Sequence, residues 1–282
     1  MNLNSDSIFC IGSSHKVCED FSKHSISKNS IHSVLVSDGC SGSTSTDTGS
    51  RVITQVATDK LDYIFGKYSD FASNIINSAR FCLEKYLNLP NQALDATLFC
   101  VAINNGKFNY YDYINNETIN YVIRGYGDGS IIKIRKDNTI EFIYIEYPSG
   151  APLYMNYYND QLRFEYYKNE FGLQRKIYKY TIINNIITDF KLDIDDNGEP
   201  YYECGIAENY KFLGVTSDGI ASFVDSNNKL VEMTSIVKAL VDFKSYKGEF
   251  IQRRMNGFNK FCVDNGWKHN DDFSFAGINN DI

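Results

Sequence analysis

Two pairs of amphipathic helices enclose a long block of strand-like segments, and this order constrains the fold more than any other feature of the chain. Apolar residues recur at spacings of three and four in four segments, which predicts helices over 47–65, 69–87, 234–243 and 249–263. Apolar runs predict strands over 31–37, 96–104, 119–125, 130–135, 140–147, 162–167, 175–183, 211–216 and 273–279. Ser69 is expected to cap the second helix and Gly266 to end the last. The pattern predicts an α+β four-layer sandwich, with two packed antiparallel sheets flanked by helices on both sides.

No repeat, linker or low-complexity tract divides the 282 residues, so we expect a single domain over 1–282. Within it, the stretch 147–204 is rich in Tyr and Asn and is expected to be a variable, flap-like region. The 7 Cys are scattered without a C-x-x-C pair, which supports neither a disulfide framework nor a structural zinc site.

The charge balance excludes some classes of partner. A net charge of -7 and a pI near 5.2 are unlike those of proteins that bind the phosphate backbone, so no nucleic-acid partner is expected. No apolar run approaches the roughly 20 residues of a membrane span, and the N-terminal residues do not resemble a signal peptide. We therefore expect a cytoplasmic protein without a membrane partner. Its oligomeric state is left open.

Carboxylates stand at the ends of strand-like segments in five places. Residues 34–40 read VLVSDGC and residues 213–220 read LGVTSDGI, so the same Ser-Asp-Gly corner follows two apolar strands. The acidic residues at the five places are Glu19 with Asp20, Asp38, Asp128, Asp218, and Asp271 with Asp272. If they met at one edge of a sheet sandwich, their mutual repulsion would be severe without cations.

Oxygen ligands without His or Cys favour Mg²⁺ or Mn²⁺, and two such ions about 3.5–4 Å apart can hold a hydroxide and a phosphoryl group for in-line attack. This chemistry is phosphoester hydrolysis. For any one of these residues, however, a turn or strand cap is the commoner explanation, because Asp-Gly is also a frequent turn dipeptide.

The order of these motifs resembles that of the metal-dependent type 2C serine/threonine protein phosphatases, bacterial branch. The resemblance covers nearly the whole chain and includes Gly12-Ser-Ser-His15 with Cys18-Glu19-Asp20, Val36-Ser-Asp38-Gly39, Asp95-Ala-Thr97, Gly127-Asp128-Gly129, Thr216-Ser-Asp218-Gly219 and Asp271-Asp272-Phe-Ser274. It implies a phosphatase that hydrolyses phosphoserine or phosphothreonine on a phosphorylated protein, such as a kinase target, by attack of a metal-bridging hydroxide. It also implies two packed sheets flanked by helices.

The resemblance further implies a binuclear centre of Mn²⁺ or Mg²⁺. Asp38, Asp218 and Asp271 would hold one ion, with Asp272 as an alternative to Asp271. Glu19, Asp38 and the Gly39 carbonyl would hold the second.

Two more acidic residues have implied roles, and three positions depart from the family pattern. Asp20 would orient the attacking water, and Asp128 would help to bind a weaker third ion. His15 stands where many members have a phosphate-binding Arg, Cys40 where animal members have a His, and Ser222 where an Asp is frequent. His15 could contact the phosphate or protonate the leaving oxygen, or it could merely bond to a loop backbone. Cys40 could be oxidation-sensitive or an inert small residue.

A second hypothesis belongs to another class of function. The substitutions at His15 and Cys40 would suit a pseudophosphatase, a catalytically weak or inactive module that binds a phosphoprotein. The complete set of Asp ligands favours the enzyme. Residues 193–198 begin like an EF-hand loop, but Cys204 stands where a bidentate Glu is needed, so we expect a hairpin turn there.

Overall fold

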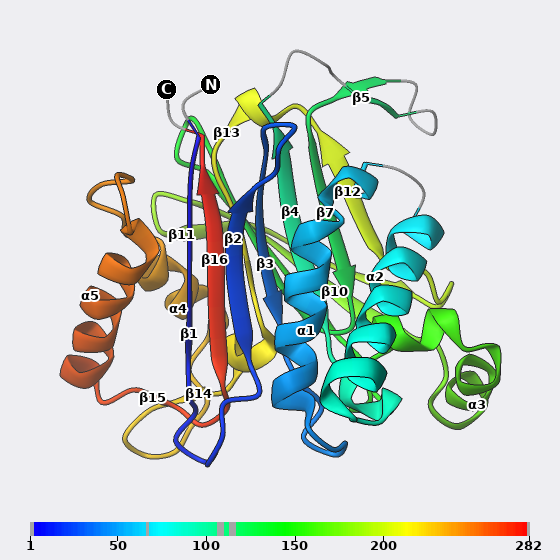
Figure 1. Ribbon diagram of the computed structural model, residues 1–282. Helices are drawn as coiled ribbons and strands as arrows, with labels where there is room; N and C mark the ends of the chain where they lie inside the picture. Colours follow the sequence, from blue (N-terminus) through cyan, green and yellow to red (C-terminus); the bar gives the residue numbers. More distant parts are fainter. Residues whose placement is uncertain (1–2, 66–67, 106–109, 113–116, 281–282) are drawn as a thin grey trace.

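The computed structural model describes residues 3–65, 68–105, 110–112 and 117–280, and it is built around two antiparallel sheets (Figure 1). The larger sheet has the order β1-β16-β13-β8-β9-β10-β11, and the smaller has the order β12-β7-β4-β3-β2. The strands of the larger sheet are β1 (Asn4–Cys10), β8 (Gly129–Arg135), β9 (Ile140–Glu146), β10 (Arg175–Ile183), β11 (Ile186–Asp195), β13 (Tyr210–Thr216) and β16 (Phe273–Asn279). Those of the smaller sheet are β2 (Phe21–Ile26), β3 (Ile31–Ser37), β4 (Leu98–Asn104), β7 (Tyr121–Tyr126) and β12 (Tyr201–Gly205).

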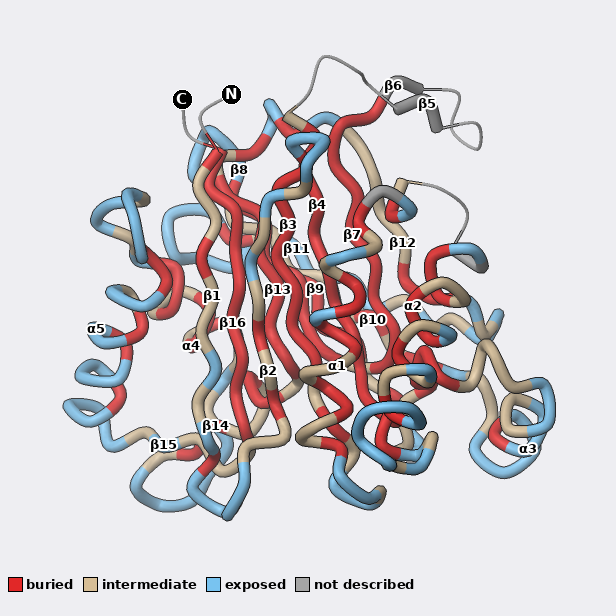
Figure 2. The backbone as a smooth tube through the Cα atoms, in the orientation of Figure 1, coloured by how far each residue is buried: buried red, intermediate tan, exposed pale blue. Residues whose placement is uncertain are grey.

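Helices cover the outer face of each sheet. The smaller sheet carries α1 (Thr46–Asp59) and α2 (Tyr68–Cys82), and the larger carries α4 (Met233–Leu240) and α5 (Phe250–Asn265) (Figure 1). Three apolar clusters fill the spaces between layers: one under α1 and α2, one between the sheets, and one under α4 and α5. Figure 2 shows this burial concentrated in the strands and on the inward sides of the helices. The predicted four-layer fold is confirmed.

Some local predictions were wrong. Residues 162–167 lie within a helix, α3 (Gln161–Phe171), because Asp160 Oδ1 accepts from the Arg163 amide at 3.1 Å and caps its first turn. The helix α2 already begins at Tyr68, so Ser69 lies inside its first turn, whereas Gly266 ends α5 in the left-handed conformation as predicted.

The strands β1, β2, β11 and β12 were not predicted, because none of them contains a long continuous apolar run. The segment 147–204 contributes β10 and β11 to the larger sheet and β12 to the smaller. Residues 193–198 are not a hairpin turn, since β11 and β12 belong to different sheets. The two small two-stranded sheets are β5 (Tyr110–Asp112) with β6 (Glu117–Ile119) and β14 (Phe223–Val224) with β15 (Lys268–His269).

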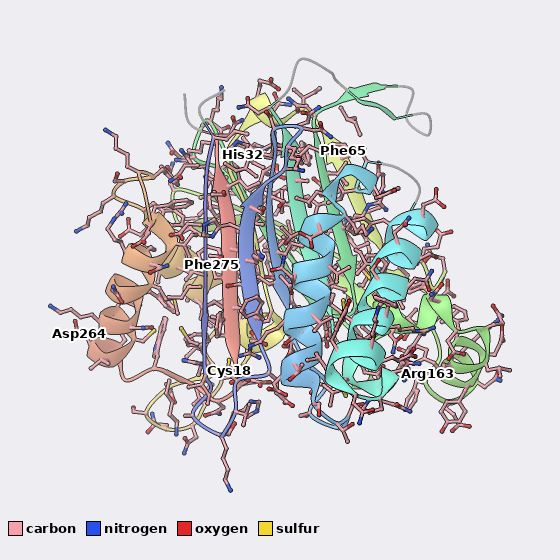
Figure 3. All side chains as sticks on the ribbon, in the orientation of Figure 1. Cys18, His32, Phe65, Arg163, Asp264 and Phe275 are labelled. Carbon is pink, nitrogen blue, oxygen red and sulfur yellow. The ribbon has the colours of Figure 1, made fainter. Side chains whose placement is uncertain are left out.

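The strand registers place the ends that carry acidic residues at one edge. Phe21 pairs with Ser37, Thr216 pairs with both Ser130 and Phe275, and these pairs terminate β2, β3, β13, β8 and β16 near the same end of the molecule. Figure 3 shows Cys18 at this lower end and His32 at the opposite one. No helix in the described parts of the chain is long and apolar enough to cross a bilayer.

Candidate active site

The first Ser-Asp-Gly corner follows β3 and is fixed by Thr97. The Asp38 amide donates to Thr97 Oγ1 at 3.0 Å, and the Thr97 amide donates to the Asp38 carbonyl at 2.8 Å. A Cβ on Gly39 would lie 2.7 Å from the Thr46 carbonyl oxygen at the start of α1. Glycine is therefore required by the close approach of the helix to this corner.

The second corner follows β13, and there Asp218 opens a short 3₁₀ helix, Asp218–Ala221. A Cβ on Gly219 would lie only 1.8 Å from the Asp272 carbonyl oxygen. This glycine lets the loop before β16 approach the second corner, so that the acidic residues of both segments come together.

Asp20, Asp38 and Asp218 form the centre of the site. Asp20 is fully buried, whereas Asp38 and Asp218 are partly buried. Burial and the charges of Asp20 and Asp218 raise the pKa of Asp38 well above its ordinary value. Burial also raises the pKa of Asp20 to about 7 and that of Asp218 to about 6, while hydrogen bonding to the Asp38 side chain lowers both. The Asp38 carboxyl thus lies between the other two.

Two oxygen atoms of this centre have no hydrogen-bond donor. Asp20 Oδ1 and Asp218 Oδ1 are buried and, within the described residues, lack any donor other than a protonated Asp38. Leaving a buried carboxylate oxygen without a donor is costly unless a proton or a cation occupies the space.

Asp128 joins the cluster from the turn between β7 and β8. The turn is made by Gly127 and Gly129, with φ of 87° and 147°, conformations that glycine adopts readily. Burial and the charge of Asp218 raise the pKa of Asp128 well above its ordinary value. Asp128 in turn contributes to the raised pKa of Asp38.

Glu19 is held at the edge of the cluster by three contacts. Glu19 Oε1 accepts from Thr46 Oγ1 at 2.9 Å, and the Glu19 carbonyl accepts from Ser50 Oγ at 2.6 Å. The Gly39 amide also donates to the Glu19 carbonyl at 3.3 Å, which ties Glu19 to the first corner.

Asp271 and Asp272 have different surroundings. The buried Asp272 carboxylate accepts from the Gly12 amide at 2.7 Å and from the Glu19 amide at 2.6 Å, so it fixes the N-terminal loop. The Asp271 side chain is 44% exposed, and its charge is the largest electrostatic contribution to the raised pKa of Asp218. Asp271 therefore faces the cluster, whereas the buried Asp272 supports the cluster by fixing the loop that carries Glu19.

The His15 ring bridges these two carboxylates. Its Nε2 lies 3.3 Å from Asp271 Oδ1 and its Nδ1 lies 3.1 Å from Asp272 Oδ2. Burial lowers the pKa of His15, but the hydrogen bond to Asp272 and the charges of Asp272, Asp271 and Glu19 raise it overall. The His15 ring therefore contacts two carboxylates, and 26% of its side chain is exposed.

The donor set fits hard divalent cations, because it consists of carboxylate oxygens, two of them buried without a donor. Among the described residues, however, no three His, Cys, Asp or Glu side chains already surround a point that a metal ion could occupy.

Sequence reasoning did not assign a supporting role to Ser217, Thr46 or Asp272, although Asp272 was named as an alternative metal ligand. Ser217 Oγ donates to Asp20 Oδ2 at 2.6 Å, Thr46 holds Glu19, and Asp272 holds the loop of residues 12–19. Ser217 belongs to the second copy of the repeated Ser-Asp-Gly motif, and this repeat was the sequence feature that could have indicated its role. The other contacts join residues distant in sequence, and nothing in the local pattern indicates them.

Cys40 connects the first corner to α3. Its amide donates to the Asp95 carbonyl at 2.9 Å, and Asp95 Oδ2 accepts from Arg163 Nη2 at 2.8 Å. Asp95 Oδ1 also accepts from Asn156 Nδ2 at 3.0 Å. Figure 3 shows Arg163 on the side of the molecule occupied by α3. The segment 147–204 is thus joined to the site through Asp95. Its variable, flap-like character stays a prediction, as does the oxidation of Cys40.

No family model matches the sequence, and no curated protein matches it. Solved structures match over the whole chain. A bacterial serine phosphatase is 16% identical, with 99% of this chain and 98% of that chain covered and a TM-score of 0.55. The serine/threonine phosphatase Stp1 from Staphylococcus aureus is 16% identical, with 100% and 96% covered and a TM-score of 0.56. The serine/threonine phosphatase of S. agalactiae is 15% identical, with 98% and 99% covered and a TM-score of 0.52. These similarities show that the chain has the fold of bacterial serine/threonine phosphatases.

Proposed function

We propose that the protein is a metal-dependent phosphatase that hydrolyses phosphoserine or phosphothreonine in proteins. The observation that carries the proposal is the meeting of Asp20, Asp38, Asp128 and Asp218, from four distant segments, with raised pKa values and two oxygen atoms without donors. Perturbed carboxylates gathered in this way are typical of functional sites. The similarity in fold to known phosphatases supports the same assignment.

The residues that would hold Mn²⁺ or Mg²⁺ follow from their positions. Asp38 and Asp218 are central, and Asp271 joins them because it faces Asp218. Glu19, whose carbonyl accepts from the Gly39 amide, and the Gly39 carbonyl would complete a second site with Asp38. Asp128 would take part in a weaker third site. When bound, such ions neutralise phosphoryl charge and lower the pKa of water toward neutrality.

The chain's own groups would position substrate and protons. His15, with its raised pKa, would carry positive charge beside the exposed Asp271 and could bind the phosphate or protonate the leaving oxygen. Asp272 would orient the His15 ring through Nδ1. Asp20, whose Oδ2 accepts from Ser217, would orient the attacking water with its second oxygen.

The proposal is tested by steady-state kinetics on p-nitrophenyl phosphate and a phosphothreonine peptide, with Mn²⁺ or with EDTA. We expect turnover only with the metal and a loss of at least about a hundredfold in Asp38→Asn and Asp218→Asn. Asp225→Asn is the matched control, because Asp225 also follows a strand, β14, but its carboxylate only bonds to the amides of a surface turn. Its activity should be unchanged.

A metal-bound protein without turnover would contradict the enzyme and favour the pseudophosphatase. Thermal unfolding with and without Mn²⁺ detects binding independently of activity. A wild-type protein that neither hydrolyses these substrates nor is stabilised by Mn²⁺ would overturn the metal-dependent site as a whole.

A further inference from the structure

The strand β11 forms one edge of the seven-stranded sheet and is exposed along most of its length. It pairs with β10 on one side, and no other strand in the described part of the chain pairs with its outer side. The strand is 10 residues long, and an edge of this length presents a row of unpaired backbone N–H and C=O groups. Exposed edges of this kind are templates for pairing with another strand.

One face of β11 is apolar although it is exposed. Phe190, Leu192 and Ile194 are 51%, 43% and 62% exposed, and beyond a bulge at Thr188 the same face continues with Ile187, which is 38% exposed. The Phe190 ring packs against Tyr180 of β10 with a centroid distance of 4.9 Å, so the apolar face continues onto the neighbouring strand. Exposed apolar residues at a sheet edge are commonly covered by a partner.

The other face of β11 carries three acidic residues and one basic residue, Asp189, Lys191, Asp193 and Asp195. Lys191 Nζ lies 2.8 Å from Asp193 Oδ1, and Asp195 is paired with Arg175 at 2.5 Å. Asp189 forms no ion pair with any described residue. The edge therefore keeps one acidic side chain available for an outside cation, beside an exposed lysine of the same strand.

We propose that β11 pairs with β11 of a second copy of this chain, in an antiparallel register centred on Phe190. Two identical antiparallel strands related by a twofold axis must be centred on one residue, because opposite residues have to be equivalent in their hydrogen bonding. In the Phe190 register, Asp189 stands opposite Lys191 twice, and the two Phe190 rings face each other. The bulge between Ile187 and Asp189 ends the regular register beyond these residues.

The neighbouring registers are less favourable in charge. A centre at Asp189 or Lys191 places identical charges opposite each other. A centre at Leu192 places Asp189 opposite Asp195 as well as Lys191 opposite Asp193, and a centre at Thr188 brings no charges together. Like charges directly opposite destabilise a strand pair, and opposite charges stabilise it. The Phe190 register is therefore the one among these that pairs opposite charges without like charges, and this choice is independent of the proposed phosphatase activity.

The test is the molar mass of the full chain, measured by sedimentation equilibrium over a range of concentrations. We expect the wild type to reach twice the monomer mass, and Lys191→Asp and Asp189→Lys each to remain monomeric. An equimolar mixture of these two variants should dimerise again, because each then meets opposite charges. The double variant Asp189→Lys/Lys191→Asp should also dimerise.

Lys260→Asp, at an exposed position of α5, is the matched charge-reversal control and should dimerise like the wild type. Circular dichroism and p-nitrophenyl phosphate turnover show whether each variant is folded. A wild type that stays monomeric overturns the proposal and leaves the edge to a different partner. A dimer that persists in Lys191→Asp, or single variants that fail to dimerise when mixed although both are folded, also overturns it.

Discussion

Ser37 and Ser217 occupy the same place in the two Ser-Asp-Gly corners, but their hydroxyl groups donate to different partners. Ser37 Oγ donates to the Thr97 carbonyl at 2.6 Å and joins two neighbouring strands of the smaller sheet. Ser217 Oγ donates to the Asp20 carboxylate at 2.6 Å and accepts from the Ser274 amide at 3.0 Å. The first serine supports the sheet, and the second also orients an acidic group of the site.

The two aspartates differ in a similar way. Asp38 lies between Asp20 and Asp218, and both charges raise its pKa well above the ordinary value. The pKa of Asp218 is raised only to about 6, because backbone and side-chain hydrogen bonds oppose burial and the charge of Asp271. The repeated motif thus provides two central carboxylates whose pKa values are raised to different extents.

The largest expected effect on stability comes from substituting the glycines of the two corners. Gly219→Ala should destabilise the protein by about 3 kcal/mol or more, because its Cβ would overlap the Asp272 backbone. Gly39→Ala should cost less, because the distance to the Thr46 backbone is 2.7 Å against 1.8 Å. Chemical denaturation measures both. Equal losses of stability for the two variants would contradict this difference in packing.

Removal of a central carboxylate should stabilise the metal-free protein. In EDTA at neutral pH, Asp38→Asn is expected to raise the free energy of unfolding by on the order of 2 kcal/mol, because repulsion and desolvation are relieved. Asp218→Asn should give a smaller gain. Thermal unfolding in EDTA tests this, and Mn²⁺ should stabilise the wild type but neither variant. Destabilisation by both substitutions in EDTA would show that these carboxylates do not repel one another.

The gain from Asp218→Asn should also depend on pH. The folded pKa of about 6 lies above the ordinary value of 3.8, so the folded wild type binds the proton more tightly than the unfolded chain. The contribution of the Asp218 carboxyl to wild-type stability is therefore fully present below pH about 4, and it is lost as the pH rises through about 6. The difference between the variant and the wild type should grow over this interval, and a constant difference would contradict it.

The smallest expected effect comes from replacing the serine of each corner by alanine. Ser217→Ala should cost about 1–2 kcal/mol and lower kcat about tenfold, because it removes the hydroxyl that donates to Oδ2 of the buried Asp20 carboxylate. Ser37→Ala should cost about 1 kcal/mol and leave kcat unchanged, because Thr97 still fixes the Asp38 backbone. Kinetics and denaturation on the same preparations distinguish them. A fall in kcat for Ser37→Ala alone would reverse the assigned roles.

Much of the fold could be predicted from local pattern. Continuous apolar runs in β3 and β16 and the periodic helices α1 and α5 identify buried elements, because burial on one or both faces leaves a direct trace in the sequence. The edge strand β11 and the helix α3 could not be predicted in this way. Both are largely exposed, so the cap at Asp160 and the pairing with β10 decide their structure.

The sequence by itself determined that acidic residues follow strand ends and that glycine accompanies both Asp38 and Asp218. Only the tertiary structure decided that these ends meet, that Asp271 faces the cluster while Asp272 supports it, and that His15 bonds to both. The physical reason is that strand periodicity is a local property, whereas the environment of a carboxylate depends on charges and donors supplied by segments far away in the chain.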